Sequence, residues 1–151
     1  MAHVFIALHV IFAVFIIGPM ALLPHTGLRA LRVHDAKQVR GLARSTSIFS
    51  WASLVVFVLG FAALGTADIP FTKLWVWLSV VLYAGAFVLS VFVIVPNLNR
   101  GAEEITSAAA ANPSVEGEKL ARPAAYSAVA ATAGVSTILL VVVVILMAFR
   151  P

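Results

Sequence analysis

The sequence predicts an all-α polytopic membrane protein with four transmembrane helices. Hydrophobic residues make up 62% of the 151-residue chain and charged residues only 11%, whereas a soluble domain carries about 25% charged residues. Four apolar segments cover residues 3–23, 46–65, 74–95 and 124–148, and each approaches the about 20 residues that cross a bilayer core. We therefore expect a single domain over residues 1–151, built as two antiparallel hairpins with links at 24–45 and 96–123.

The first segment, residues 3–23, is expected to stay in the membrane as a helix. No Lys or Arg precedes it, and its apolar run exceeds the about 7–15 residues of a signal-peptide core. Pro19 follows Gly18 inside the segment and removes a backbone hydrogen bond, so we expect a kink there. The helix should then continue past Pro24 to about Arg32.

The first link is expected to be largely helical. Asp35 is a favourable N-cap residue, and Gln38 follows three positions later, as in a capping box. A helix beginning at Ala36 could run without a break into the second segment, residues 46–65. The first two segments would then form a long helical hairpin.

Basic residues predict the orientation of the chain. The first link holds five of them, which are Arg29, Arg32, Lys37, Arg40 and Arg44. The second link adds Arg100, Lys119 and Arg122, whereas the opposite side has Lys73 and Arg150. This asymmetry places both links in the cytoplasm and both termini outside. It also explains the net charge of +4 without nucleic acid. We expect the five residues of the first link to contact anionic lipid headgroups or, alternatively, a protein partner.

The third segment, residues 74–95, opens with an aromatic group. Trp75 and Trp77, with Phe71 nearby, are expected to form an aromatic belt at the outer interface; the alternative is a stacking surface for a ligand. In the following link we expect a separate short helix near Ala102–Ala111. Glu103 and Glu104 would lie at its favourable N-terminal end, and a proline at position 113 would end it.

The fourth segment, residues 124–148, has a face of small and polar residues. The residues recur every four positions as Ala124, Ala128, Thr132 and Ser136, and a second small pair is Ala130 and Gly134. Such faces allow helices to approach closely, with hydroxyl groups bridging between them. We interpret them as helix-packing positions in the bundle or an oligomer. Lining a path for a lipid or a small polar substrate is the alternative.

Two short matches suggest an internal repeat. The sequence LLPH at residues 22–25 resembles IVPN at 94–97, and LAR recurs at 42–44 and 120–122. A duplication would relate the two hairpins by an axis along the membrane normal.

Polar groups inside the membrane are the candidate functional residues. No Asp, Glu, Lys or Arg lies in the middle of a segment, which argues against an ion-coupled pump in this chain alone. His9 is the exception, and we expect it to bond a Ser, Thr or Tyr hydroxyl; haem or metal binding is the alternative. His25 and His34 lie beyond the first segment, so a bis-histidine haem or a three-histidine zinc site is not expected.

Enzymatic function is not supported by any motif in the sequence. The chain has no cysteine, which excludes disulfides and thiolate metal sites. No phosphate-binding loop, nucleophile elbow, paired carboxylates or metalloprotease motif is present.

The chain resembles several small bacterial membrane families. Residues 7–14 (ALHVIFAV), followed by Gly18 and Pro19, are similar to the first helix of HemJ-type protoporphyrinogen oxidases and CopD-like copper proteins. The segment 51–60 (WASLVVFVLG), the four-helix layout and the basic first link more closely resemble the uncharacterised domain of unknown function 2269. The HemJ resemblance implies a haem-binding histidine in the first helix, which only His9 matches, without the intramembrane lysine that would accompany it.

These observations lead to three hypotheses for a multi-pass protein of the bacterial inner membrane. The first is a non-enzymatic accessory or scaffolding subunit of a larger envelope complex, such as one for lipid or solute transport. It would contact the bilayer and other membrane subunits or itself, and would need no cofactor. The second is a redox protein that binds haem b or a metal through His9. The third is a small homo-oligomeric transporter or channel.

Overall fold

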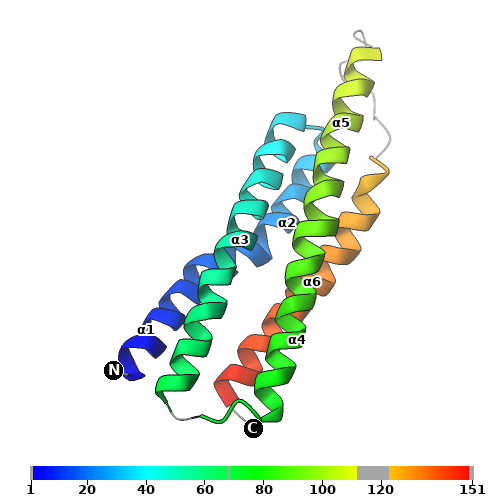
Figure 1. Cartoon of the computed structure of the whole chain (residues 1–151). Coiled ribbons are helices and arrows are strands. Elements are labelled where there is room, and N and C mark those ends of the chain that lie inside the picture. Colours follow the sequence, from blue (N-terminus) through cyan, green and yellow to red (C-terminus); the bar gives the residue numbers. More distant parts are fainter. Residues whose placement is uncertain (1, 68, 112–122, 150–151) are drawn as a thin grey trace.

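The computed structural model describes residues 2–67, 69–111 and 123–149, and these residues form helices joined by short turns. Four helical spans are long and apolar enough to cross a membrane: His3–Arg32, Ala36–Thr66, Leu74–Ala111 and Ala125–Phe149. The predicted all-α fold with four membrane-spanning helices is therefore confirmed. Figure 1 shows an elongated bundle in which the first and last helices have their free ends at the same end of the bundle. We call this the termini end, and the opposite end, which carries Arg29 to Arg44, the basic end.

The first span consists of α1 (Ala2–Phe12), a π-helical turn η1 (Ala13–Ile17) and α2 (Gly18–Arg32). The π turn ends two residues before Pro19, whose ring would collide with the carbonyl four residues earlier in a regular α-helix. The wider π turn relieves that collision, and it lets the freed carbonyl groups accept hydrogen bonds from other donors. The predicted distortion at Gly18 and Pro19 is thus present as a π turn, and the helix continues through Pro24 to Arg32 as expected.

The second span is the single helix α3 (Ala36–Thr66). Asp35 is its N-cap, and the Asp35 carboxylate accepts a hydrogen bond of 2.9 Å from the Gln38 backbone N–H, which confirms the predicted cap. His34 adopts a left-handed backbone with φ of 55°, a conformation in which His is enriched relative to most residues. The first link is therefore largely helical, as predicted, and α2 and α3 form one long hairpin with a tight turn over residues 33–35.

The third span consists of α4 (Leu74–Val88), the π turn η2 (Leu89–Ile94) and α5 (Val95–Ala111). The prediction of a separate short helix near Ala102–Ala111 is wrong, because the helix is continuous from Leu74 to Ala111. Pro96 does not break the helix, because the π turn η2 ends two residues before it and accommodates the proline ring. The π turn η1 does the same for Pro19. The expected terminating proline at position 113 lies outside the described residues.

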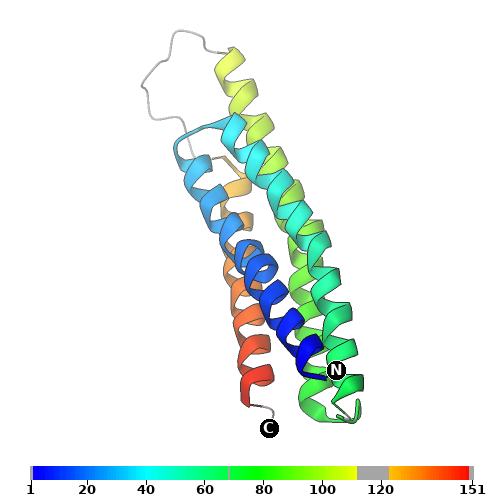
Figure 2. The same cartoon turned by 90° about the vertical axis from the view of Figure 1, so that its left-hand side faces the viewer.

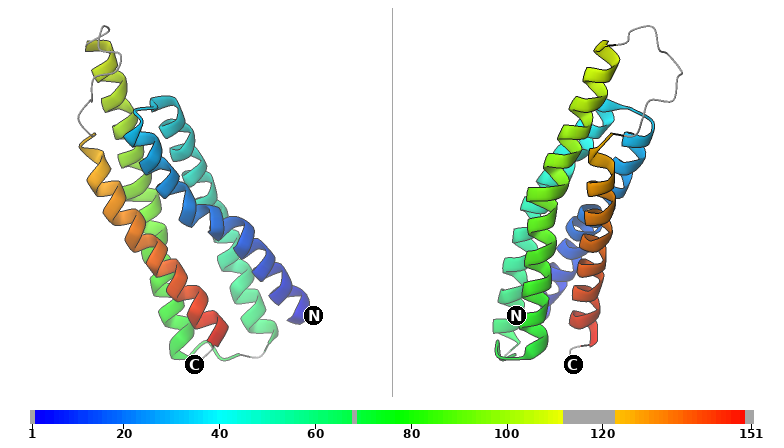
Figure 3. Two further views of the ribbon diagram at one scale, coloured as in Figure 1. Left: turned by 180° about the vertical axis from the view of Figure 1, so that it is seen from behind. Right: turned by 90° about the vertical axis from the view of Figure 1, so that its right-hand side faces the viewer.

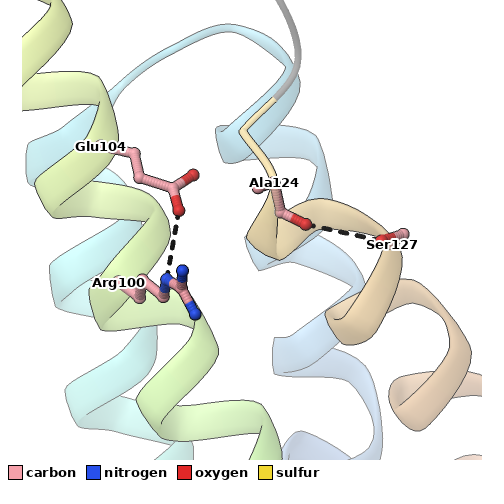
Figure 4. Close-up of polar contacts among 4 residues, drawn as sticks. All are labelled: Arg100, Glu104, Ala124 and Ser127. Carbon is pink, nitrogen blue, oxygen red and sulfur yellow. Dashed lines mark hydrogen bonds and ion pairs between the residues drawn. The ribbon is translucent and has the colours of Figure 1, made fainter.

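The fourth span is α6 (Ala125–Phe149). In Figure 2 the beginnings of α3 and α6 and the extended α5 gather at the basic end, where α5 reaches furthest. Figure 4 shows two local contacts there. Arg100 and Glu104 form an i,i+4 ion pair of 3.3 Å on α5, and the Ser127 hydroxyl donates to the Ala124 carbonyl at 3.5 Å.

The core near the basic end contains a reciprocal contact between α2 and α5. A Cβ atom on Gly27 would lie 2.8 Å from Cδ2 of Leu98, and one on Gly101 would lie 2.6 Å from Cδ2 of Leu31. Both leucines are fully buried. Each helix therefore contributes a glycine that receives the leucine of the other helix, which is the close packing that drives helix association in membranes.

The two ends of the bundle are packed differently. Towards the basic end, α2 packs against both α3 and α6. Beyond the π turn, α1 packs against α3, and Figure 3 shows α1 and α6 diverging towards the termini end. The change of direction at η1 therefore leaves space between α1 and α6.

Candidate functional site

A cavity of about 700 Å³ occupies the space between the diverging helices. Its walls come from α1, η1, α3, α4 and α6, near the termini end. The lining is almost wholly apolar, with His9, Ser79 and Tyr83 among the few polar side chains. Volumes of about 300–1,000 Å³ with a few placed polar groups are typical of small-molecule sites.

His9 lies on the α1 wall of the cavity and is held by α3. Its Nδ1 is 2.9 Å from the backbone carbonyl oxygen of Val56. The expectation that His9 bonds a hydroxyl is therefore wrong, because the partner is a backbone carbonyl. The absence of a side chain at Gly60 makes the hydrogen bond between His9 and Val56 possible, because a Cβ at position 60 would lie only 3.0 Å from Cε1 of His9.

The contact with Val56 determines the tautomer of His9. A carbonyl oxygen only accepts hydrogen bonds, so Nδ1 must carry the proton and Nε2 of the neutral ring presents a lone pair. Among the described residues Nε2 has no hydrogen-bond partner, and it is not sealed from the surface. His9 thus offers an acceptor, or a metal-ligating nitrogen, at the cavity wall.

Ser79 and Tyr83 lie on the α4 wall of the cavity, one turn apart. The Tyr83 hydroxyl is 2.7 Å from Oγ of Ser53, and Ser53 donates to the Ser50 carbonyl oxygen at 2.6 Å. Ser79 is only 3% exposed, yet its hydroxyl has no partner among the described residues. The Ser79 hydroxyl oxygen has no accessible surface, so it is enclosed behind the cavity lining and does not face a bound molecule.

Aromatic rings close part of the cavity. Phe57 stacks on Tyr83 with centroids 5.1 Å apart, and Phe57 contacts Phe61 edge-on. Trp75 is 8% exposed and lines the cavity, whereas Trp77 is 60% exposed. The expected aromatic belt is therefore divided, because positions two residues apart on an α-helix point to nearly opposite sides: Trp77 faces outward and Trp75 faces inward.

A second polar site lies outside the cavity, on the face shared by α2 and α6. Nε2 of His25 is 3.0 Å from Oγ1 of Thr137, and Thr137 also contacts the Ala21 carbonyl. Thr137 lies midway along α6, and His25 lies one turn before Arg29 on α2. His25 is exposed.

The five basic residues of the first link are all exposed at the basic end. Two of them also bond neighbouring helices. Arg32 donates to the Tyr126 hydroxyl at 2.7 Å and lies over its ring, and Arg40 donates to the Thr106 hydroxyl at 3.3 Å. Arg29, Lys37 and Arg44 complete the surface for which a partner or lipid headgroups were predicted.

The predicted packing face of α6 is partly buried. Ser136 is buried and lies 3.5 Å from both the Ser90 hydroxyl and the Ala86 carbonyl. The other five positions are half-buried or exposed: Ala124, Ala128, Ala130, Thr132 and Gly134. Gly134 is notable because a Cβ there would meet nothing within 4 Å. It therefore faces open space beside Thr137, one turn away.

Metal-binding groups are sparse in the described part of the chain. No cluster of three or more His, Cys, Asp or Glu residues there could hold a metal ion. His9 and Met147 both line the cavity, and they are the side chains there with a nitrogen or sulfur that haem iron accepts.

Four apolar spans enclosing an intramembrane cavity define an integral membrane protein of the helix-bundle class. The chain matches the family described as "Predicted integral membrane protein (DUF2269)" over residues 3–151 and belongs to that family. No curated protein and no solved structure matched the chain.

The cavity could be foreseen only in part. The single intramembrane histidine and the proline in the first span were visible in the sequence, and both contribute to the cavity. The roles of Gly60 and Trp75 depend on how α1 crosses α3, which hydropathy does not specify. A signal was nevertheless present, since Ser79 and Tyr83 are spaced by one helical turn on an otherwise apolar helix.

Proposed function

We propose that this protein is a non-enzymatic accessory subunit of a larger complex in a bacterial cytoplasmic membrane. The observation that carries this proposal is the pair of His25 and Thr137 on an exposed face shared by α2 and α6. Polar side chains inside a membrane almost always face protein or a water-filled cavity. Because Thr137 lies midway along the membrane-spanning helix α6, this polar pair calls for a covering protein surface.

The surroundings of His25 suit a transmembrane helix of another subunit. Ala130 and Gly134 lie one turn apart on α6, and Thr137 continues the same face. The open space at Gly134 would let a foreign backbone approach closely, and His25 or Thr137 could bond across the interface. The basic end supplies a further contact surface through residues such as Arg29 and Lys37, which anionic headgroups could also use.

We expect Gly134→Leu to abolish assembly while leaving this chain folded. The added side chain would fill the groove from outside, and leucine is the better helix former by about 1 kcal/mol. Gly65→Leu is the matched control, because a Cβ at Gly65 also meets nothing within 4 Å but lies on α3 at the termini end, away from both proposed contact surfaces.

The measurement is native mass spectrometry of complexes extracted gently from the native membrane. The proposal requires extra subunits in the wild type and Gly65→Leu samples and their loss in Gly134→Leu. Retention of the same assembly by Gly134→Leu would contradict it. A mass made only of copies of this chain would instead favour the homo-oligomeric transporter.

A second candidate function, haem binding, is supported by the orientation of His9. A metal-ligating histidine usually donates its other ring N–H to a carbonyl or carboxylate, and Nδ1 of His9 is positioned to do this with Val56. Met147 on α6 lines the same cavity and could offer a second ligand. Bound haem would supply one-electron chemistry, with this chain tuning its electronics.

The haem candidate makes a spectroscopic prediction. Protein purified from haem-replete cells should show a Soret band, and His9→Ala should lose it while its circular dichroism stays helical. Met147→Leu should shift the band if the sulfur is a ligand. A wild-type spectrum without a Soret band would exclude this function.

A further inference from the structure

The cavity opens sideways between α1 and α6, towards the region that lipid occupies. Val10 and Val14 on one rim and Val144 on the other are exposed, and all three also line the cavity. The rims belong to membrane-spanning helices, so a molecule can enter from the bilayer without crossing water. The occupant is therefore expected to be a molecule dissolved in the membrane.

The lack of charged side chains in the cavity lining decides whether a charged or a neutral molecule can bind. No Asp, Glu, Lys or Arg is found among the described residues that line the cavity. A phosphate or carboxylate would have no counter-charge there, and burying an unpaired charge is strongly unfavourable. The occupant should be neutral.

One accessible polar group specifies how the occupant is held. Nε2 of His9 can only accept, because the proton is on Nδ1 facing Val56. The Ser79 hydroxyl has no accessible surface, so it does not reach a ligand. A complementary ligand therefore presents a hydroxyl to His9, with its apolar body lying against Phe57, Val76 and Leu140.

We propose that this cavity binds a neutral, hydroxyl-bearing glycerolipid of the diacylglycerol class. Its free hydroxyl donates to Nε2 of His9, and its acyl chains occupy the apolar cleft between α1 and α6. The site is independent of the proposed subunit interface on α2 and α6. It excludes haem, because both ligands require Nε2 of His9.

Trp75 provides a built-in reporter of occupancy. The double variant Trp51→Phe/Trp77→Phe leaves Trp75 as the single tryptophan, at the cavity wall. The matched variant Trp51→Phe/Trp75→Phe leaves Trp77, which lies on the same helix and is exposed to lipid. Both are placed in phosphatidylcholine nanodiscs and titrated with diacylglycerol that carries brominated acyl chains, which quench tryptophan on contact.

We expect quenching of Trp75 to saturate at probe levels that quench Trp77 only weakly. The O-methyl ether of the same probe lacks the donor and should lose this preference. Equal quenching of the two tryptophans, or equal behaviour of the ether, would overturn the proposal.

Substitution of His9 tests the polar contact. His9→Phe should weaken the saturable quenching by about fivefold, the effect of losing one net hydrogen bond. Ser79→Ala is the control, since Ser79 belongs to the cavity wall but its hydroxyl has no accessible surface. An unchanged His9→Phe titration, or a Soret band showing haem at His9, would overturn the proposal.

Discussion

Replacing Gly101 by Val is expected to lower the free energy of unfolding by about 3 kcal/mol, the upper part of the usual range for overpacking. The first added carbon would lie 2.6 Å from Cδ2 of Leu31. Leu31 is fully buried in the core between α2, α3 and α5, so its side chain has little room to move. The measurement is thermal or denaturant unfolding of the purified chain in mild detergent.

A second substitution, at Leu31, should restore most of the free energy of unfolding that Gly101→Val removes. Leu31→Ala removes as many carbons as Gly101→Val adds, and alone it should cost about 2–5 kcal/mol by leaving a cavity. Combined, the two changes conserve volume, so the double variant should be more stable than the sum of the single effects predicts. Gly41→Val controls for a β-branched residue in a helix, because nothing lies within 4 Å of a Cβ there. Additive losses in the double variant would show that Leu31 and Gly101 do not share one contact.

The number and type of the spans could be predicted because hydropathy and length are properties of each segment alone. Four stretches of about 20 apolar residues admit few structures other than membrane helices. The helix start at Ala36 was also predictable, because the cap formed by Asp35 involves residues only three positions apart. Local signals of this kind do not depend on how the helices pack.

The errors arose where tertiary structure decides the outcome. The third segment was expected to end at residue 95 and a separate helix to follow, but the π turn η2 accommodates Pro96 and the helix continues to Ala111. The continuity of the first span likewise brings His25 next to Thr137 of α6. The cavity depends on the direction in which α1 leaves η1, and hydropathy carries no information about that direction.

The π turns themselves can be tested as one-residue insertions. A π turn closes its hydrogen bonds over five residues instead of four, so it holds one residue more than the α-helix it interrupts. Deleting Val14, an exposed residue of η1, should convert the turn to α-helix and keep both flanking helices in register. Pro19→Ala is included in the same variant to remove the ring that would otherwise collide with the preceding turn.

Deleting Leu22 in the same Pro19→Ala background is the matched comparison. Leu22 is also an exposed aliphatic residue, but it lies in α2, where no extra residue exists. Its loss would rotate all preceding residues by about 100°, one residue of a helix with 3.6 residues per turn. Met20 would leave its buried position, at a cost of about 2–5 kcal/mol, and His9 would turn away from the Val56 carbonyl.

We therefore expect the Val14 deletion to remain folded, whereas the Leu22 deletion should aggregate or unfold at a much lower temperature. Size-exclusion profiles and unfolding temperatures in detergent distinguish the two. Saturable quenching of Trp75 then reports whether His9 still faces the cavity in the Val14 deletion. If both deletions are equally disruptive, η1 is not a one-residue insertion, and the divergence of α1 from α6 must have another cause. If the Val14 deletion folds but loses the quenching, the π turn itself is what holds the cavity open.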